Sequence, residues 1–180
     1  LILTKGIVVE VTALLAREMN HRPVKAVSPT HLQRAVQFLH DPGISVVRDA
    51  MIITSAGEVH AMHDPTEGGV ATGVYELTEA AGVGATLDEA ALPIYPETRM
   101  LCEAYDLNPL GLLASGSLLA SVAPQDASEM IQRLQAADIQ ATAIGKIRET
   151  PGVVLLSSTG ERTLPEFERD EIARLFEPIA

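Results

Sequence analysis

Along this chain the spacing of apolar residues changes repeatedly from the helical period to the strand period and back. Ile7, Val11 and Leu15 recur at the spacing of one helix face. Residues 118–122 instead form a short apolar run between turn signals, which is typical of a buried strand. Helices and strands must therefore pack against one another, so the spacing excludes all-α and all-β folds.

Helical spacing, caps and breakers predict a series of helices. Pro42 and Gly43 close the second of them, and Gly82 closes the fourth. In the third helix the apolar spacing runs through Val47 and Met51. The predicted ranges are 7–19 (ending near Arg22-Pro23), 29–39, 47–54, 70–81, 96–105, 127–134 and 170–176.

The segments between these helices predict short strands at 1–3, 58–63, 85–87, 118–122, 141–147 and 153–157. Gly160 follows the last of them and predicts the turn of an antiparallel hairpin. This order predicts a single α+β domain, a layered α/β/α arrangement with a mixed sheet. The chain starts with an apolar strand and no Met, so we expect residues 1–180 to be one domain of a longer protein.

Composition excludes several functional classes. With 47% hydrophobic and 21% charged residues, the chain is neither disordered nor collagen-like. The net charge of −11, with no run of Lys and Arg, disfavours nucleic-acid binding. Cys102 is the single cysteine, and we expect it to be a buried structural thiol. No apolar run is long enough for a membrane span or a secretory leader, so we expect a cytoplasmic protein with no membrane partner.

The strongest candidate for chemistry is the loop at residues 63–69, between a predicted strand and a predicted helix. A helix N-terminus after glycines presents backbone N–H groups to an anion, and here Gly68 and Gly69 allow close approach. His63 and Thr66 could contact the same ligand. Asp64 could act as a general base or bind magnesium. The loop is thus a candidate phosphate-binding site.

Each of these residues also has an ordinary structural explanation. Asp64 or Thr66 could simply cap the following helix, and Pro65 could shape the turn. His60 and His63 are three apart on a predicted strand, so their side chains should point to opposite faces, and we do not predict a metal site. A second loop, with Ser115 and Gly116, suits a phosphate or a ribose but could equally be a plain turn.

Several long strings carry a resemblance to a known family. They are ILTKGIVVEVTALLA, HAMHDPTEGGVATGVYELTEAAGVG, LDEAALPIYPETRMLCEAYDLNPLGLLASGSLLASV and AIGKI. Together they resemble the C-terminal domain of the aminoimidazole ribonucleotide (AIR) synthetase superfamily, over residues 1 to about 150. Within it, the D-P-T-x-G-G loop, the helix after it and the A-L-P segment are most similar to hydrogenase maturation proteins of the HypE type.

The resemblance implies a two-domain parent that forms a homodimer. Its N-terminal domain would hold most of the ATP and magnesium, and the glycine loop of this domain would face the cleft between them. Such enzymes activate an amide-type oxygen or a similar acceptor through a phosphorylated intermediate. Asp64, Thr66, Gly68 and Gly69 match the family's loop, and Ser115 with Gly116 matches a second turn at the cleft.

Two departures from the HypE pattern bear on function. HypE-type chains end in a Cys that accepts a carbamoyl group, whereas this sequence ends Phe176-Glu177-Pro178-Ile179-Ala180. Glu67 stands where those proteins usually have Arg, and Ala114-Ser115-Gly116 stands where they often have Asn-Glu-Gly. We therefore predict the substrate-side half of an ATP-dependent enzyme, inactive in isolation. The alternatives are a non-catalytic anion- or partner-binding module and a HypE-like maturation factor.

Overall fold

The computed structural model describes residues 1–18 and 27–176, and its helices and strands follow the predicted order. The α-helices are α1 (Val9–Glu18), α2 (Pro29–Val36), α3 (Val47–Ala56), α4 (Gly69–Ala81), α5 (Pro96–Tyr105) and α6 (Ala127–Ala136). Short 3₁₀ helices are η1 (Gln37–Leu39), η2 (Glu89–Ala91), η3 (Pro109–Gly111) and η4 (Glu171–Phe176). The strands are β1 (Ile2–Thr4), β2 (Val59–His63), β3 (Gly84–Asp88), β4 (Leu119–Val122), β5 (Ala141–Ala143), β6 (Gly145–Arg148), β7 (Gly152–Ser157) and β8 (Gly160–Thr163).

The strands form two four-stranded sheets. The first has the order β2-β4-β1-β5, and its neighbouring strands are antiparallel. The second has the order β6-β3-β7-β8 and is mixed, because β3 and β7 run parallel. The predicted C-terminal hairpin is present as β7 and β8, with Ser157 paired to Gly160 across its turn. The α+β class is thus confirmed, with two sheets where one mixed sheet was predicted.

The prediction of a single strand over 141–147 is wrong, because the chain crosses from one sheet to the other in the middle of it. The crossing is at Ile144, whose N–H donates to Leu1 O and whose carbonyl accepts from the Asp88 N–H. Gly145 begins β6 so close to Leu87 that a Cβ would lie 2.9 Å from the Leu87 Cα. The apolar spacing continues through the crossing, so it does not reveal the change of sheet.

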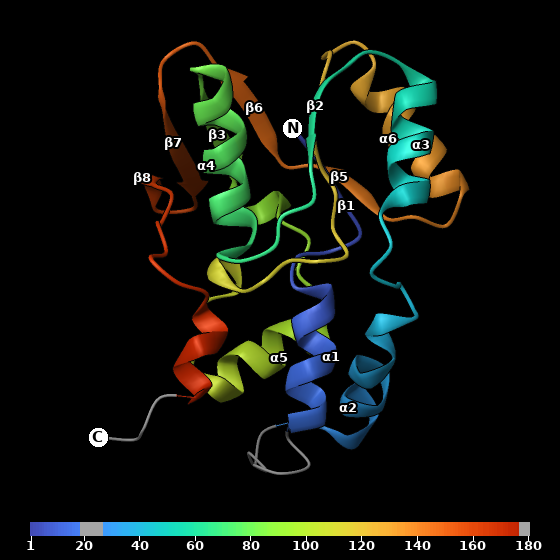
Figure 1. Ribbon diagram of the computed structural model, residues 1–180, viewed down its shortest axis with the longest axis vertical. Coiled ribbons are helices and arrows are strands. Elements are labelled where there is room, and N and C mark those ends of the chain that lie inside the picture. The colour runs from blue at the N-terminus through green and yellow to red at the C-terminus, as the bar shows by residue number, and fades with distance from the viewer. Residues whose placement is uncertain (19–26, 177–180) are drawn as a thin grey trace.

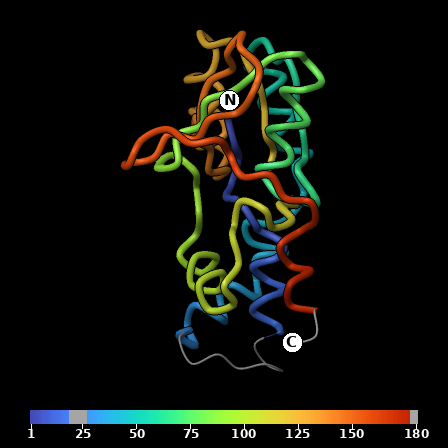
Figure 2. The backbone as a smooth tube through the Cα atoms, turned by 90° about the vertical axis from the view of Figure 1, so that its left-hand side faces the viewer, coloured from blue at the N-terminus to red at the C-terminus, as the bar shows by residue number. Residues whose placement is uncertain are grey.

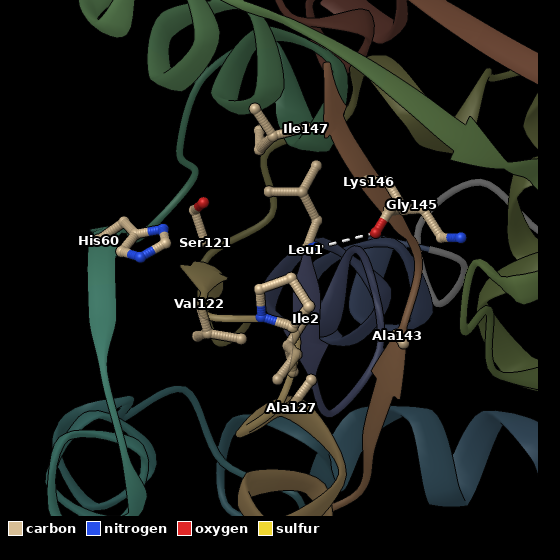
Figure 3. Close-up of a pocket in the computed structure, with 11 residues that line it drawn as sticks. Leu1, Ile2, His60, Ser121, Val122, Ala127, Ala143, Gly145, Lys146 and Ile147 are labelled. Carbon is tan, nitrogen blue, oxygen red and sulfur yellow. Dashed lines mark hydrogen bonds between the residues drawn. The ribbon is translucent and has the colours of Figure 1, made fainter. Parts of the chain in front are cut away.

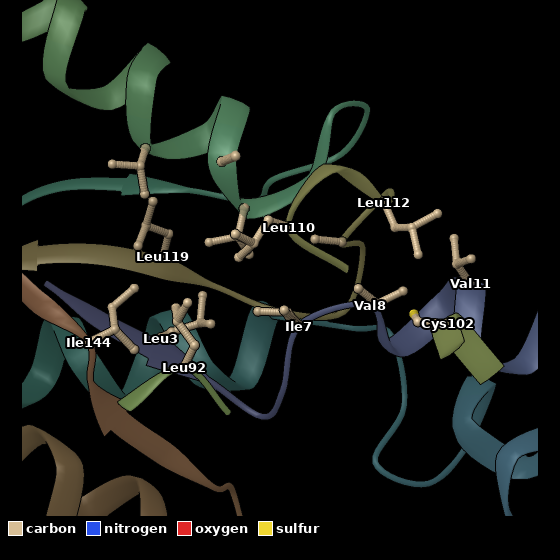
Figure 4. Close-up of a cluster of buried hydrophobic side chains, with 14 of the residues drawn as sticks. Leu3, Ile7, Val8, Val11, Leu92, Cys102, Leu110, Leu112, Leu119 and Ile144 are labelled. Carbon is tan, nitrogen blue, oxygen red and sulfur yellow. The ribbon is translucent and has the colours of Figure 1, made fainter. Parts of the chain in front are cut away.

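One large apolar cluster lies between the sheets and the helices (Figure 4). It joins Leu3 of β1 and Leu119 of β4 to Val11 of α1 and Leu112 after η3. A smaller cluster lies under α3 and α6, around Ile53 and Met130. Figure 1 shows α4 against one sheet, α3 and α6 beside the other, and α1, α2 and α5 together at the opposite end. In Figure 2 the segment after β8 runs along the molecule to the end of α1.

Of the residues predicted to face inward in the first helix, Ile7, Val11 and Leu15 are buried, with Leu14 as an exception, whereas α3 buries a face other than the one predicted. The first helix begins at Val9 rather than Ile7, and Leu14, predicted on its inner face, is 39% exposed. Met19 and Arg22-Pro23 lie outside the described residues. In α3 the buried residues are Asp49 and Ile53, whereas Val47 and Met51 are 65% and 67% exposed. The predicted closing helix is the 3₁₀ helix η4.

In the described part of the chain, no helix has the length and apolarity needed to cross a bilayer. Cys102 is buried, as predicted, and burial raises the pKa of its thiol to about 12.

Candidate functional site

The predicted glycine loop joins the end of β2 to the start of α4. Asp64, Thr66 and Glu67 are exposed on it, whereas Gly68 and Gly69 are buried. The Gly69 N–H donates to Thr66 O at 3.1 Å, which closes the loop into a tight turn. The arrangement exposes the polar side chains and turns the backbone sharply into the helix.

Both loop glycines adopt a backbone conformation that other residues rarely take. Gly68 has φ +72° and Gly69 has φ +67°. A Cβ on Gly69 would lie 2.5 Å from the carbonyl oxygens of Leu110 and Leu112. A glycine is therefore required at position 69 both by the backbone angle and by the close approach of the neighbouring chain.

The two predicted loops lie together. The Ala114 N–H donates to Thr66 O at 3.3 Å, and the Glu10 N–H at the start of α1 donates to Ser115 O at 3.3 Å. Gly116, with φ +101°, packs against Val9, because a Cβ there would lie 2.9 Å from the Val9 Cβ. The N-termini of α4 and α1 thus meet on the same turn, as Figure 1 also shows.

The segment entering α1 has an unusual backbone. Lys5 and Val8 have φ values of +57° and +65°. A β-branched residue such as Val8 adopts this conformation at a cost of about 1–3 kcal/mol, and such strain is found most often at functional sites. Val8 is fully buried, and its carbonyl accepts from the Thr12 hydroxyl at 2.6 Å. Packing therefore holds a strained turn at the edge of the candidate site.

The surroundings of Asp64 shift the pKa of its carboxyl group. Partial burial raises the pKa of Asp64, the positive charges of His63 and Lys5 oppose the rise, and the charge of Glu10 adds to it. Lys5 and Glu10 therefore lie near Asp64, a proximity that was not predicted from the sequence. Neither carries a motif, and only the folding of β1 and α1 against the loop brings them there.

Lys5 is committed to other partners. Its ammonium donates to Ser45 O at 2.6 Å and lies 3.4 Å from the Asp49 carboxylate, with side-chain exposures of 5% and 1%. Asp49 also accepts from the Thr4 hydroxyl at 2.6 Å. This buried network fixes the start of α3 against the end of β1.

His63 faces α4 rather than a metal site. Its Nε2 lies 2.6 Å from the Glu76 carboxylate, and Glu76 is more than half exposed. His60 is exposed, in keeping with the opposite faces expected of the two histidines. Among residues 1–18 and 27–176, no three His, Cys, Asp or Glu side chains form a group that could hold a metal ion.

Asp170 already supplies an anionic oxygen to the loop. Its Oδ2 accepts from the Gly68 N–H at 3.0 Å, and its Oδ1 accepts from the Ile172 N–H at 3.0 Å. From the sequence, Asp170 was predicted only as the start of a closing helix. Its role could not be found from the pattern, because 102 residues separate it from Gly68.

A cavity of about 560 Å³ opens where β6 approaches the first sheet, and none of the predicted site residues lines it. Figure 3 shows His60 and Ser121 on one side of Leu1, with Gly145 and Lys146 on the other. Its remaining lining is mostly apolar, including Ile2, Val122 and Ile147. The cavity is therefore separate from the candidate site.

Residues 1–157 match the family described as AIR synthase related protein, C-terminal domain. The chain belongs to this family. The AIR synthase-related domain is 34% identical over 102 residues to carbamoyl dehydratase HypE of Cupriavidus necator, an alignment that covers 56% of this chain and 29% of that protein. The likeness to HypE proteins is thereby confirmed.

Solved structures confirm the AIR synthase-related fold. The crystal structure of Escherichia coli HypE matches with a TM-score of 0.74 and 23% identity, over 97% of this chain and 52% of that one. A structure of HypE in complex with ATP matches with a TM-score of 0.67 and 19% identity, over 94% of this chain and 51% of that one. The chain thus spans about half the length of these solved relatives.

Proposed function

We propose that this domain is the substrate-side half of an ATP-dependent enzyme of the AIR synthase-related family. The parent would phosphorylate an amide-type oxygen or a similar acceptor on a small, amide- or phosphate-containing substrate. We further propose that the parent is a cytoplasmic homodimer and that this half alone does not turn over ATP. The family membership and the solved relative in complex with ATP support the proposal.

The observation that carries the proposal is the hydrogen bond from Gly68 to Asp170. The backbone N–H of Gly68 donates to a carboxylate oxygen, so a phosphate oxygen that takes the place of Asp170 could accept from the same donor. The N-terminus of α1 adds a second positive helix end beside the same turn. Thr66 contributes an exposed hydroxyl, and Ser115 lies next to the joined backbone.

In this proposal Asp64 is the catalytic residue. A carboxylate with a raised pKa holds a proton more strongly than an ordinary one, so it suits a general base that receives a proton from the acceptor. His63, Thr66, Gly68, Gly69, Ser115 and Gly116 would bind the substrate or its phosphate. The exposed Glu67 adds negative charge to the rim and would oppose a bare phosphate.

Magnesium fits this site only if a carboxylate of this domain and the phosphate of the substrate bind it together. It favours oxygen ligands and is commonly held by one or two carboxylates together with substrate phosphates. Asp64 is the residue of this domain that would contribute a carboxylate. When bound, the cation would offset the charges of Asp64 and Glu67 against phosphate. We propose that ATP and magnesium are held mainly by an N-terminal domain of the parent.

Titration with magnesium and pyrophosphate, followed by amide NMR, tests the site in the 180-residue chain. We expect shifts at residues 66–69 and 114–116. The variant Thr66→Val should weaken binding several-fold, whereas Thr159→Val, the same change at the exposed β7–β8 turn, should not. If both variants bind pyrophosphate equally well, the loop does not bind the phosphate and the proposed site is wrong. Robust ATP hydrolysis by the isolated chain would contradict the assignment of a half-enzyme.

A HypE-like role in hydrogenase maturation is the second candidate. The identity to carbamoyl dehydratase HypE favours it. Within the described residues the one cysteine is the buried Cys102, so a carbamoyl group would need an acceptor outside them. Transfer of carbamoyl to a separate Cys-bearing peptide would favour this candidate. The third candidate is a non-catalytic anion- or partner-binding module. In that case the Asp64→Asn variant should bind pyrophosphate as well as the wild type does, and the substitution should remove no activity.

A further inference from the structure

The outer face of α3 exposes large apolar side chains. Val47 and Met51, one helical turn apart, are 65% and 67% exposed, and Ile44 just before the helix is 41% exposed. On the opposite side of the same helix, Ile53 is fully buried in the cluster shared with α6. The helix is therefore apolar on two faces, and the described chain covers one of them. Contiguous exposed apolar groups of this kind mark interaction sites.

One basic side chain lies on this face of an acidic molecule. A hollow of about 540 Å³ lies along it, lined by Ser45, Val47, Arg48, Met51, Ile52 and Ser55. Its one charged lining residue is Arg48, which is exposed and makes no ion pair with the described residues. The whole chain carries 24 acidic and 13 basic residues. An unpaired arginine beside two exposed apolar side chains is thus a local exception on an acidic protein.

The apolar face of α3 also borders the candidate site. Ser45 O accepts from the Lys5 ammonium at 2.6 Å. The Ile44 Cα lies within 3.2 Å of the point that a Cβ on Gly116 would occupy. A protein bound at this face would therefore lie beside the turn on which the two helix N-termini meet.

We propose that the outer face of α3 binds an amphipathic helix of a partner protein. Apolar residues of that helix would contact Val47 and Met51, and an acidic residue of it would pair with Arg48. The paired spacing of the two apolar residues is that of helix-to-helix packing. A second copy of this chain fits less well. A two-fold contact of α3 with itself would bring the two Arg48 side chains together, and like charges at an interface oppose association. The inference does not depend on the proposed catalytic function.

Two synthetic peptides test the proposal in the 180-residue chain. Both carry leucines at helical positions i, i+3, i+4 and i+7, one with flanking glutamates and one with flanking lysines at the same positions. We expect the acidic peptide to bind at least about tenfold more tightly, measured by fluorescence anisotropy and mapped by NMR. The double variant Val47→Ser/Met51→Ser should lose about tenfold or more in affinity, because the apolar contact is removed. Ile147→Ser, which alters an exposed apolar residue on β6, is the matched control and should bind normally.

Arg48→Glu separates charge recognition from apolar adhesion. It should reverse the preference, so that the lysine peptide binds more tightly than the glutamate peptide. Equal binding of the two peptides, an unchanged affinity in the α3 variants, or no binding by the acidic peptide would each overturn the proposal. Dimerisation in sedimentation that is lost in Val47→Ser/Met51→Ser would also overturn it, since the face would then be covered by a second copy.

Discussion

The carboxylate of Asp170 accepts a hydrogen bond from the backbone N–H of Gly68 at 3.0 Å. This bond ties the segment after β8 to Gly68, the first glycine of the loop. Because the acceptor is charged, the bond is stronger than one between neutral groups. The segment after β8 thus helps to set the conformation of the candidate site.

Replacing Asp170 should destabilise the protein and loosen the loop. We expect Asp170→Ala to cost about 1–2 kcal/mol in the free energy of unfolding, because the buried N–H of Gly68 and the cap of η4 both lose their acceptor. Urea unfolding measures the cost, and faster amide exchange at Gly68 locates it. Glu168→Ala, on the same segment but exposed, is the control. Equal stability of the two variants would show that the bond does not contribute.

Two glycines with the same φ separate backbone strain from steric contact. Gly69 and Gly82 both have φ +67°, but a Cβ on Gly69 would lie 2.5 Å from two carbonyl oxygens, whereas nothing lies within 4 Å at Gly82. Gly82→Ala should therefore cost about 1 kcal/mol, from the backbone alone. Gly69→Ala should cost at least about 2 kcal/mol more, because backbone atoms must move. Thermal or urea unfolding measures both, and a smaller cost at Gly69 would contradict the close contact.

The local parts of the fold could be predicted from the sequence, and the long-range parts could not. Caps and breakers such as Pro29 and Gly82 act on their own neighbours, so the helix order is correct. The face that α3 buries was not predicted, because Val47 and Met51 satisfy the helical period as well as Ile53 does. Periodicity records that a residue is apolar and not what it contacts.

The same distinction applies to the candidate site. The glycine loop was predicted because the residues that form it are consecutive. Its contact with the Ser115 turn was implied by the family resemblance, and the hydrogen bond from Ala114 to Thr66 shows it. Lys5, Glu10 and Asp170 were missed, since they approach the loop from separate elements and belong to no motif.

Replacing only one partner of the buried ion pair of Lys5 and Asp49 should strongly lower the free energy of unfolding. Lys5→Met leaves the Asp49 carboxylate 1% exposed with only its Thr4 hydrogen bond, so we expect a loss of about 3–5 kcal/mol. The double variant Lys5→Met/Asp49→Leu should lose less stability than the sum of the losses in Lys5→Met and Asp49→Leu, because no charge remains buried. Arg133→Met, which breaks the exposed pair with Glu129, should cost under about 1 kcal/mol. Urea unfolding of the four variants, Asp49→Leu included, gives the coupling, and strict additivity would exclude an interaction between Lys5 and Asp49.

The raised pKa of Asp64 should appear in the dependence of stability on pH. A carboxyl whose pKa is higher in the folded than in the unfolded protein binds its proton more tightly when folded. Its contribution is therefore complete below the ordinary pKa of 3.8 and is lost as the pH rises through the raised value. Relative to wild type, Asp64→Asn should gain stability as the pH increases from about 3 to about 7, since an amide does not ionise.

The pKa of Asp64 should also respond to its two charged neighbours, and carboxyl ¹³C titration measures it directly. Glu10→Gln should lower the pKa of Asp64 by removing a negative charge, and Lys5→Met should raise it by removing a positive one. Shifts of the opposite sign would mean that these two charges do not act on Asp64 as the fold places them, and Asp64 would lose its candidacy as the base.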